Sequence, residues 1–422
     1  MSLALAALCG CVTNQDEVAG TATWYVQSAP GVSDGGIGTA AQPFHSLARV
    51  QAAAGPGDEI IVIAALPGAA ALDGGIVLQR GQTLRGVAVD GAPVLRNSDP
   101  GRQGGDVVIL ADDTLVTGLV ISDAAGHAFV GRNVQGAVIR ANQIRGANSA
   151  GLASVSTGAT AGLGVPEFPK GAIAWVHDEQ AEASAAIRPN VVAENEIQGF
   201  RSDGRLVRLG GAAVALHTSG SARAALKVTG NRVRDLGPGF PRSGILIDSQ
   251  DASHIELEVQ DTSVSNASDS SDGILIVAQH QSHVTAQIRR YRYEGGHAGQ
   301  GVGNNGLEVV TYHGRNWLYA GPSLPEQHAA SARVLMEESD ITGTGGFGIA
   351  VWNIFGKPSA DTVLDFGGGE LGGRGANRIT ASGMELPESM DVYVVHHDLN
   401  AGNNWWGRDR AGQAKAVQMN GE

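Results

Sequence analysis

The sequence has very few cysteines and lysines. Its 422 residues include two cysteines, Cys9 and Cys11, and four lysines, against 42 acidic residues. Because both cysteines lie in the first eleven residues, the rest of the chain has neither a thiol nor a disulfide. The formal net charge of −13 argues against the basic surface that a nucleic-acid partner requires. With 42% hydrophobic and 17% charged residues, the composition also excludes a disordered chain.

Long hydrophobic runs are missing too. The N-terminal run MSLALAALCGC is too short to span a bilayer and is typical of an export signal. Its end, Leu8-Cys9-Gly10-Cys11, resembles the lipobox of bacterial lipoproteins, which implies lipidation of Cys11 and a signal over residues 1–11. Val12 favours the outer membrane, with the protein facing the periplasm or the surface, and residues 12–21 would form a polar tether. The alternative is an ordinary cleaved signal peptide and a secreted protein.

Glycine, in contrast, is abundant, and it marks an internal repeat. Of the 61 glycines, several open one pattern of glycine, apolar, any residue, apolar, at spacings of 33, 29 and 33 residues: GAAVALHT from Gly211, GILIDSQD from Gly244, GILIVAQH from Gly273 and GLEVVTYH from Gly306. Further copies begin at Gly171, Gly348 and Asp391. A second pattern places Asn142, Asn195 and Asn231 at equivalent turns, where stacked side chains can bond each other. A period near 30 with several strands per period predicts a parallel β-solenoid, whereas a β-sandwich would show no fixed period.

Only one segment has helical spacing. Phe44, Leu47 and Val50 predict a short helix that ends before Gly55. The segment Gln42–Ile63 resembles the N-terminal cap and first strand of the pectate-lyase-like superfamily, and Asn403–Gly407 resembles a motif near the ends of such proteins. The resemblance implies an all-β fold, a right-handed parallel β-helix (solenoid) with a short N-terminal capping helix. We expect a single domain over residues 22–407 and a C-terminal tail over 408–422. Proteins with this fold include lyases, hydrolases, epimerases and adhesins, so the chemistry must be argued from a site.

The repeat predicts a polar stripe along one outer face. Residues one and three after each glycine should point inward, and those two, four and six after it should point outward. The outward positions and the following turn supply the expected substrate-binding residues: Trp175, His177, His217, Asp248, Gln250, Asp251, Gln279, His280, Trp352 and His397. Aromatic faces beside convergent polar groups suit a polysaccharide partner. The alternative is an ordinary solvated sheet face, on which polar residues are normal.

The expected catalytic residues are Tyr312, His313 and Arg315. Tyr312 and His313 lie at the end of a predicted strand, and Arg315 lies in the long loop Gly314–Ser331 that follows it. In β-elimination on a uronic-acid sugar, Arg315 would neutralise the carboxylate, and Tyr312 or His313 would move the proton. A glycoside hydrolase would instead need two carboxylates, with Asp248 paired to Asp251 or to Glu308. From another class, the alternatives are a non-catalytic polysaccharide-binding or adhesive module and a structural solenoid without a ligand.

No metal site is predicted with defined ligands. Calcium is a possible cofactor, because Asp248, Asp251, Asp269 and Asp272 carry suitable oxygen ligands, but no spaced loop motif joins them. The segment Asp269–Asp272 is better explained as a polar turn. His396 and His397 are adjacent on a predicted strand and therefore point to opposite faces. We expect a monomer that has a polysaccharide partner, a lipid anchor and no nucleic-acid partner.

Overall fold

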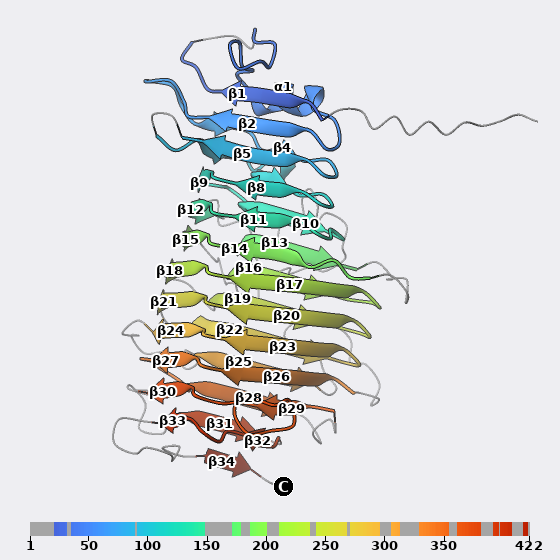
Figure 1. Ribbon diagram of the computed structural model, residues 1–422, viewed down its shortest axis with the longest axis vertical. Helices are drawn as coiled ribbons and strands as arrows, with labels where there is room; N and C mark the ends of the chain where they lie inside the picture. The colour runs from blue at the N-terminus through green and yellow to red at the C-terminus, as the bar shows by residue number, and fades with distance from the viewer. Residues whose placement is uncertain are drawn as a thin grey trace, which may run out of the picture.

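The chain is wound into a stack of coils. The computed structural model describes residues 21–31, 35–88, 91–147, 171–178, 186–200, 211–236, 242–267, 271–295, 305–312, 329–353, 361–380, 391–395, 397–406 and 417–420. Within these residues the strands form three parallel sheets, here called A, B and C, of 12, 11 and 11 strands. Successive strands of the chain enter the three sheets in turn, so each turn of the chain lies on the one before it (Figure 1). The fold is a right-handed parallel β-helix, as predicted.

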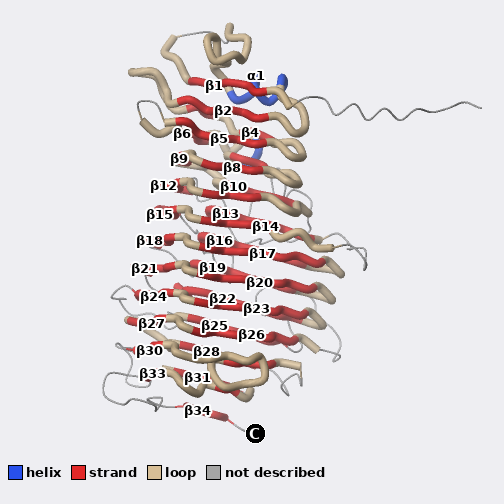
Figure 2. The backbone as a smooth tube through the Cα atoms, in the orientation of Figure 1, coloured by secondary structure: helices blue, strands red, loops and turns tan. Residues whose placement is uncertain are grey.

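The strands are short and follow one another closely (Figure 2). Sheet A contains β1 (Thr23–Gln27), β2 (Glu59–Ile63), β5 (Thr83–Val87), β8 (Leu115–Thr117), β11 (Val138–Arg140), β14 (Asn190–Ala193), β17 (Arg223–Thr229), β20 (His254–Gln260), β23 (His283–Arg289), β26 (Ser331–Glu337), β29 (Val363–Asp365) and β32 (Leu399–Asn400). Sheet B contains β3 (Leu72–Asp73), β6 (Val94–Arg96), β9 (Val120–Ser122), β12 (Gln143–Ala147), β15 (Glu196–Phe200), β18 (Arg232–Leu236), β21 (Ser263–Ala267), β24 (Arg292–Gly295), β27 (Asp340–Thr342), β30 (Arg378–Thr380) and β33 (Trp405–Trp406). Sheet C contains β4 (Ile76–Val77), β7 (Val108–Ile109), β10 (Phe129–Arg132), β13 (Gly171–His177), β16 (Gly211–Thr218), β19 (Arg242–Ser249), β22 (Ser271–Gln279), β25 (Leu307–Tyr312), β28 (Ile349–Asn353), β31 (Val392–Val395) and β34 (Val417–Asn420).

The predicted helix, α1 (Leu47–Ala53), lies beside β1 at the N-terminal end of the stack (Figure 1). Ser46 caps it, because its hydroxyl accepts a 3.3 Å hydrogen bond from the Arg49 backbone N–H. Leu47 and Val50 are buried in the core below the first coils. The helix therefore covers apolar side chains that the first coil would otherwise expose.

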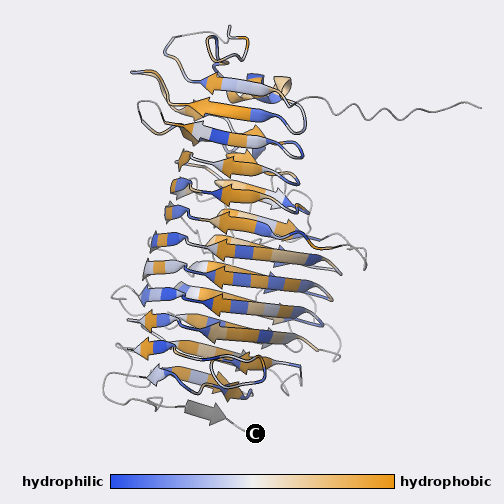
Figure 3. Cartoon of the chain, viewed as in Figure 1, coloured by the Kyte–Doolittle hydropathy of each residue, from blue (hydrophilic) through white to orange (hydrophobic). Residues whose placement is uncertain are grey.

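The core is a column of aligned apolar side chains. In sheet C, Ile245 pairs with Val214 on one side and with Ile274 on the other, and the same position continues through Leu307 and Ile349. All five are buried in one hydrophobic cluster. Polar bands alternate with apolar ones along the strands that face the viewer in Figure 3. The alternation places one set of side chains in the core and the other on the outer faces.

The predicted asparagine stack is confirmed between sheets A and B. Asn195 accepts hydrogen bonds from the backbone N–H and the side-chain amide of Asn142, at 3.0 and 3.1 Å. Asn231 accepts the equivalent pair of bonds from Asn195, at 3.0 Å each. All three side chains are buried. The turns between sheets A and B are thus bonded directly from one coil to the next.

The repeated glycines are required by packing at the start of sheet C. A Cβ atom on Gly273 would meet the Tyr291 hydroxyl, and it would lie 2.5 Å from both Tyr293 Cδ2 and the Gly306 carbonyl oxygen. Tyr291 and Tyr293 come from the turn into sheet B and from β24, and both are buried in the core. The glycine signature therefore marks where sheet C passes close to side chains from sheet B.

The last strand lies beyond the predicted domain boundary at residue 407. Val417–Asn420 forms β34, which pairs in parallel with β31 and extends sheet C by one rung. Within the described residues, no helix combines the length and the apolar character needed to cross a bilayer.

Candidate functional site

The repeat glycines do not all occupy the same position in sheet C. Ile173 pairs with Val214, and Val214 pairs with Ile245, so the copy that begins at Gly171 is displaced by one residue from the copy at Gly244. A displacement of one residue turns every side chain to the opposite face of a strand.

Because of this displacement, the predicted direction of two site residues is wrong. Trp175 was expected to point outward, but it pairs with Leu216, lies in the main core cluster and is fully buried. His177 pairs with Thr218 in the same inward set and is also buried. Burial lowers the pKa of His177 to about 4, because a charged imidazole would lose its hydration there. Neither side chain can contribute to a surface groove.

The copy at Gly211 is displaced by two residues, which brings His217 next to Asp248. The two residues pair across β16 and β19, both on the outward set. His217 Nδ1 lies 2.8 Å from Asp248 Oδ2, and both side chains are fully buried. Sequence reasoning had placed them in two different columns, so the structure brings together a pair that the glycine alignment separated.

Two glutamines also donate hydrogen bonds to the Asp248 carboxylate. Gln279 Nε2 donates to Oδ1 at 2.9 Å, and Gln250 Nε2 donates to Oδ2 at 3.0 Å. In the tautomer whose Nδ1–H donates to this carboxylate, the lone pair of the imidazole is on Nε2. We call His217, Asp248, Gln250 and Gln279 the dyad cluster. It has the arrangement of a general base whose orientation is fixed by a carboxylate.

The dyad cluster lies in an apolar part of the outer face. Val176, Leu246, Leu275, Val277 and Val310 form a second hydrophobic cluster on sheet C, separate from the core. Such surroundings strengthen the interaction between His217 and Asp248, because little water screens it. Gln250 is only half-buried, and it connects the cluster to the turn that follows β19.

The next two predicted residues, Asp251 and His280, form an outer pair in that turn. The Asp251 backbone N–H donates to His280 Nδ1 at 3.1 Å, and the Asp251 carboxylate accepts from the Gly220 N–H at 2.8 Å. His280 holds the pKa of Asp251 below its ordinary value, despite the opposing effect of partial burial. Asp251 is exposed and accessible where the dyad cluster is not, whereas the His280 side chain is only 12% exposed.

The remaining predicted residues fall in three places. The backbone of Tyr312 pairs with Gln279, and both residues lie on sheet C with His217. Trp352 lies on β28, paired with Val310, but its side chain and that of Tyr312 lie outside the described residues. His313 and Arg315 lie wholly outside them.

His397 is not part of the outward row. Its Nε2 atom lies 2.9 Å from Thr311 Oγ1, and both residues are buried. Thr311 follows Leu307 and Val309 in the inward set of β25. The predicted substrate-binding role of His397 therefore conflicts with the direction of its side chain.

Asp272 and Glu308 form a pair of carboxyl groups on sheet C, although the sequence analysis named them only separately, as a calcium ligand and as a hydrolase carboxylate. Asn305 Nδ2 donates to Asp272 Oδ1 at 3.1 Å and to Glu308 Oε2 at 2.8 Å. Burial and the neighbouring Glu308 charge raise the pKa of Asp272 well above its ordinary value, and burial also raises the pKa of Glu308. The pair therefore retains a proton that isolated carboxylates would lose. Glu308 falls at an outward position of the repeat, which is the one sequence signal for it.

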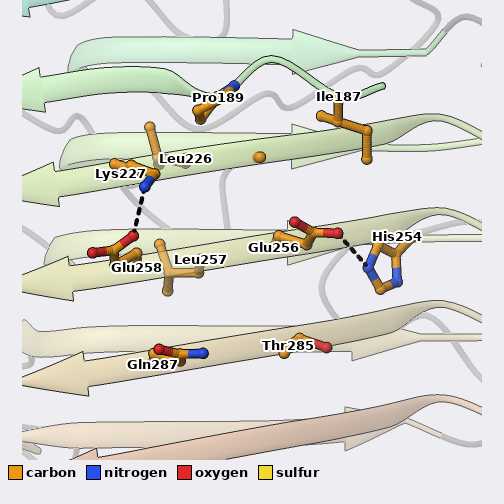
Figure 4. A pocket seen from close by; sticks show the side chains of 11 residues that line it. Ile187, Pro189, Leu226, Lys227, His254, Glu256, Leu257, Glu258, Thr285 and Gln287 are labelled. Carbon is orange, nitrogen blue, oxygen red and sulfur yellow. Dashed lines mark ion pairs between the residues drawn. The ribbon is translucent and has the colours of Figure 1, made fainter. Parts of the chain in front are cut away.

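A groove of about 440 Å³ lies elsewhere, on the outer face of sheet A (Figure 4). Its lining includes Lys227, His254, Glu256, Glu258 and Gln287, from β17, β20 and β23. Sequence reasoning missed this groove because it followed the glycine-marked strand of each coil. The available signal was the alternation of polar residues in HIELEVQ and HVTAQIR, the strands that follow.

The described carboxylates do not fit a calcium ion. No group of three or more His, Cys, Asp or Glu side chains within the described residues is placed to hold a metal. The Asp248 oxygens accept from His217, Gln250 and Gln279, and Asp272 is bonded to Asn305. Asp269 lies outside the described residues.

No family model and no curated protein matches the sequence. Among solved structures, the chain is similar to the pectate lyase Pel9A, with a TM-score of 0.38 and 12% identity over 93% of this chain and 82% of that chain. It is also similar to the native GH136 lacto-N-biosidase from Eubacterium ramulus, with a TM-score of 0.27 and 11% identity over 74% of this chain and 68% of that chain.

Proposed function

We propose that the protein is a carbohydrate-active β-helix of the cell envelope that cleaves a uronic-acid-containing polysaccharide by β-elimination. The observation that carries this proposal is the His217–Asp248 pair on the outer set of sheet C. A carboxylate that fixes the imidazole tautomer and leaves Nε2 as the proton acceptor is what removal of a proton from carbon requires.

The proposed reaction assigns each proton and electron pair. His217 Nε2 removes the proton from the sugar carbon next to the carboxylate. The carbon–oxygen bond of the glycosidic linkage then breaks, and the electron pair of the former C–H bond forms the new carbon–carbon double bond. Tyr312, whose backbone pairs with Gln279, would protonate the leaving oxygen. His313 is the alternative donor.

The substrate carboxylate needs a cation, since it is an anion that must approach the carboxylate of Asp248. Arg315 is the residue that we assign to this task. Its guanidinium would form a bidentate pair with the uronate and make the adjacent C–H more acidic. The overall charge of −13 makes this local cation essential.

Glycoside hydrolysis has less geometric support. Asp248 and Glu308 are two strands apart and two residues out of register, so their Cα atoms are about 12 Å apart from strand spacing and rise. The carboxylates of a hydrolase lie about 5–10 Å apart, so the side chains of Asp248 and Glu308 would have to lean toward each other. In addition, both oxygens of Asp248 are already occupied by donors, and Asp251 lies in the turn beyond.

One observation favours the second candidate, a non-catalytic polysaccharide-binding or adhesive module. His217 and Asp248 are fully buried, and a base must reach its substrate to act. In that case the dyad cluster would stabilise the outer face, and exposed residues such as Asp251 would meet the polymer.

The deciding experiment incubates the purified protein with a panel of uronans and follows the ultraviolet absorbance of unsaturated uronate. The proposal expects absorbance to increase with at least one uronan and to be abolished in the Tyr312→Phe, Arg315→Ala double variant. Measurable binding to a uronan without any increase in absorbance would replace the lyase with the binding module.

We also propose lipidation at Cys11 and an outer-membrane location, based on the Leu8–Cys11 pattern. Metabolic labelling with a fatty acid should mark the wild type and the Cys9→Ser variant, but not Cys11→Ser. Equal labelling of both variants would reject this assignment. Light scattering after size-exclusion chromatography tests the expected monomer.

A further inference from the structure

We infer that the groove on the outer face of sheet A is a separate saccharide site that binds a cationic amino-sugar unit. Figure 4 shows it between the segment before β14 and the outward side chains of β17, β20 and β23. It belongs to a different sheet from the dyad cluster, so it does not depend on the proposed cleavage.

The hollow exists because one outward side chain is small. Ala225 pairs with Glu256, which in turn pairs with Thr285, so these three form one column down the groove. The neighbouring column is Lys227, Glu258 and Gln287. Long side chains in the second column and a methyl group at Ala225 leave a depression above Glu256.

The groove contains one carboxylate more than it has cations. Lys227 Nζ pairs with Glu258 Oε2 at 2.9 Å, which neutralises that carboxylate. Glu256 has a looser contact, with its Oε1 atom 3.7 Å from His254 Nε2, and its side chain is 54% exposed. Burial lowers the pKa of His254, which makes its imidazole a weaker counter-charge for Glu256.

Arginines flank this site without entering it. Arg223 pairs with His254 in the register of sheet A, and Arg333 pairs with Thr285, but neither is among the lining residues. Arg333 is also in contact with Glu370 at 3.3 Å. The lining itself is therefore acidic, and the overall charge of −13 adds to its attraction for cations.

The other lining groups suit a sugar ring. Ile187 and Pro189 form an apolar wall on which the carbon–hydrogen face of a sugar can pack. Thr285 and Gln287 offer a hydroxyl and an amide for ring hydroxyl groups. Adjacent strands are about 4.8 Å apart, which is close to the length of one sugar unit, so a short oligomer can follow the coils. An ammonium group on such a sugar would bind Glu256 by a charge-assisted hydrogen bond.

Calorimetric titration of the full chain tests this inference with three probes of equal length: a glucosamine oligomer, its N-acetylated counterpart and a galacturonate oligomer. We expect the glucosamine oligomer to bind about tenfold or more tightly than the N-acetylated one, since an ion pair in a partly buried site is worth about one such factor. Added salt should weaken this binding.

Three variants locate the binding. Glu256→Gln removes the charge at nearly constant shape and should cost about tenfold in affinity for the glucosamine oligomer. Ala225→Leu fills the hollow and should reduce binding of both glucosamine-based probes. Glu294→Gln, on sheet B, is the matched control and should bind as the wild type does.

Failure of glucosamine binding, equal affinity for the acetylated probe, or unchanged affinity in Glu256→Gln would overturn the inference. Loss of uronan cleavage would not affect it, because the absorbance assay with uronans reports on sheet C and the glucosamine titration on sheet A.

Discussion

His217 and Asp248 are 31 residues apart in sequence, yet His217 Nδ1 and Asp248 Oδ2 lie 2.8 Å apart without any solvent exposure. Neighbouring coils create this contact, because residues in register on adjacent strands are about 4.8 Å apart. The solenoid thus aligns a base and its orienting carboxylate without a loop. The orientation of the Asp248 carboxylate is fixed further by hydrogen bonds from Gln250 and Gln279.

Changing Asp248 to Asn should impair cleavage more than binding. The new amide would face the Nδ1–H of His217 with a donor and favour the wrong tautomer, so we expect kcat to fall about 10²–10⁴-fold with a small change in KM. His217→Gln should have a similar effect. Steady-state kinetics on the uronan that the wild type cleaves gives both parameters.

His45→Gln is the control for these two substitutions, because His45 bonds to the Gln27 carbonyl oxygen in the first coil, remote from sheet C. It should cleave at the wild-type rate. If Asp248→Asn retained full kcat, with unchanged far-ultraviolet circular dichroism, the dyad cluster would have no catalytic role.

Removing an asparagine from the stacked turns should destabilise the fold. Asn195→Ala deprives the buried Asn142 N–H of its acceptor and the Ile139 carbonyl oxygen of its donor. Each unsatisfied buried group costs about 1–3 kcal/mol, so we expect a loss of about 2–4 kcal/mol in the free energy of unfolding. Chemical denaturation followed by circular dichroism measures it. Gln143→Ala, which follows Asn142 in the equivalent turn of the preceding coil, should stay within about 0.5 kcal/mol of the wild type; equal effects would argue against the stack.

A methyl group at Gly273 should be poorly tolerated. Gly273→Ala would place Cβ against the Tyr291 hydroxyl and 2.5 Å from Tyr293 Cδ2, so we expect a loss of about 1–3 kcal/mol from overpacking. Adding Tyr291→Phe should recover part of it, since the hydroxyl is one of the clashing groups. Gly55→Ala, where the nearest atom to the new Cβ lies at 3.8 Å, should hardly change the stability. Thermal melts of the three variants and the wild type measure these differences. A Gly273→Ala protein as stable as the wild type would show that packing does not require glycine at this position.

His177 should make the fold sensitive to acid. Its folded pKa of about 4 lies below the ordinary 6.5, so the unfolded chain binds more protons between these values, and stability rises with pH across this window. The difference corresponds to about 3 kcal/mol, which is fully present above pH 6.5 and is lost as the pH falls to 4. Denaturation at pH 4 and pH 7 should show a smaller difference for His177→Gln than for the wild type. Identical differences in the two proteins would mean that His177 ionises normally.

Much of the fold could be predicted from sequence, because the repeat and the turn asparagines are local signals. The spacing of Asn142, Asn195 and Asn231 predicted their stacking, and the spacing of Phe44, Leu47 and Val50 predicted α1. Each of these patterns depends on residues within one coil or at one repeated turn. Neighbouring coils then add only the hydrogen bonds that the pattern anticipates.

The register of sheet C was harder to predict from the sequence. The glycine at Gly171 or Gly211 is not the structural equivalent of Gly244, because coil lengths vary and the close approach to sheet B begins at different points. A displacement of one residue was enough to move Trp175 into the core, and a displacement of two placed His217 beside Asp248. Period alone fixes which residues share a sheet, whereas the facing direction depends on pairings that only the folded chain reveals.

The side chains that join sheets A and B change character along the stack. The linked asparagines end at Thr262, which accepts from the Asn231 N–H at 3.4 Å, and the next turn has Tyr291, whose ring enters the core. A second series starts at Ser339 and continues through Asn377 to Asn404. Since each coil touches only its neighbours, the turns between sheets A and B form two hydrogen-bonded series. Tyr291, whose backbone N–H donates to Ser339 Oγ at 3.2 Å, lies between them. A substitution in one series should therefore leave the turn bonds of the other series in place.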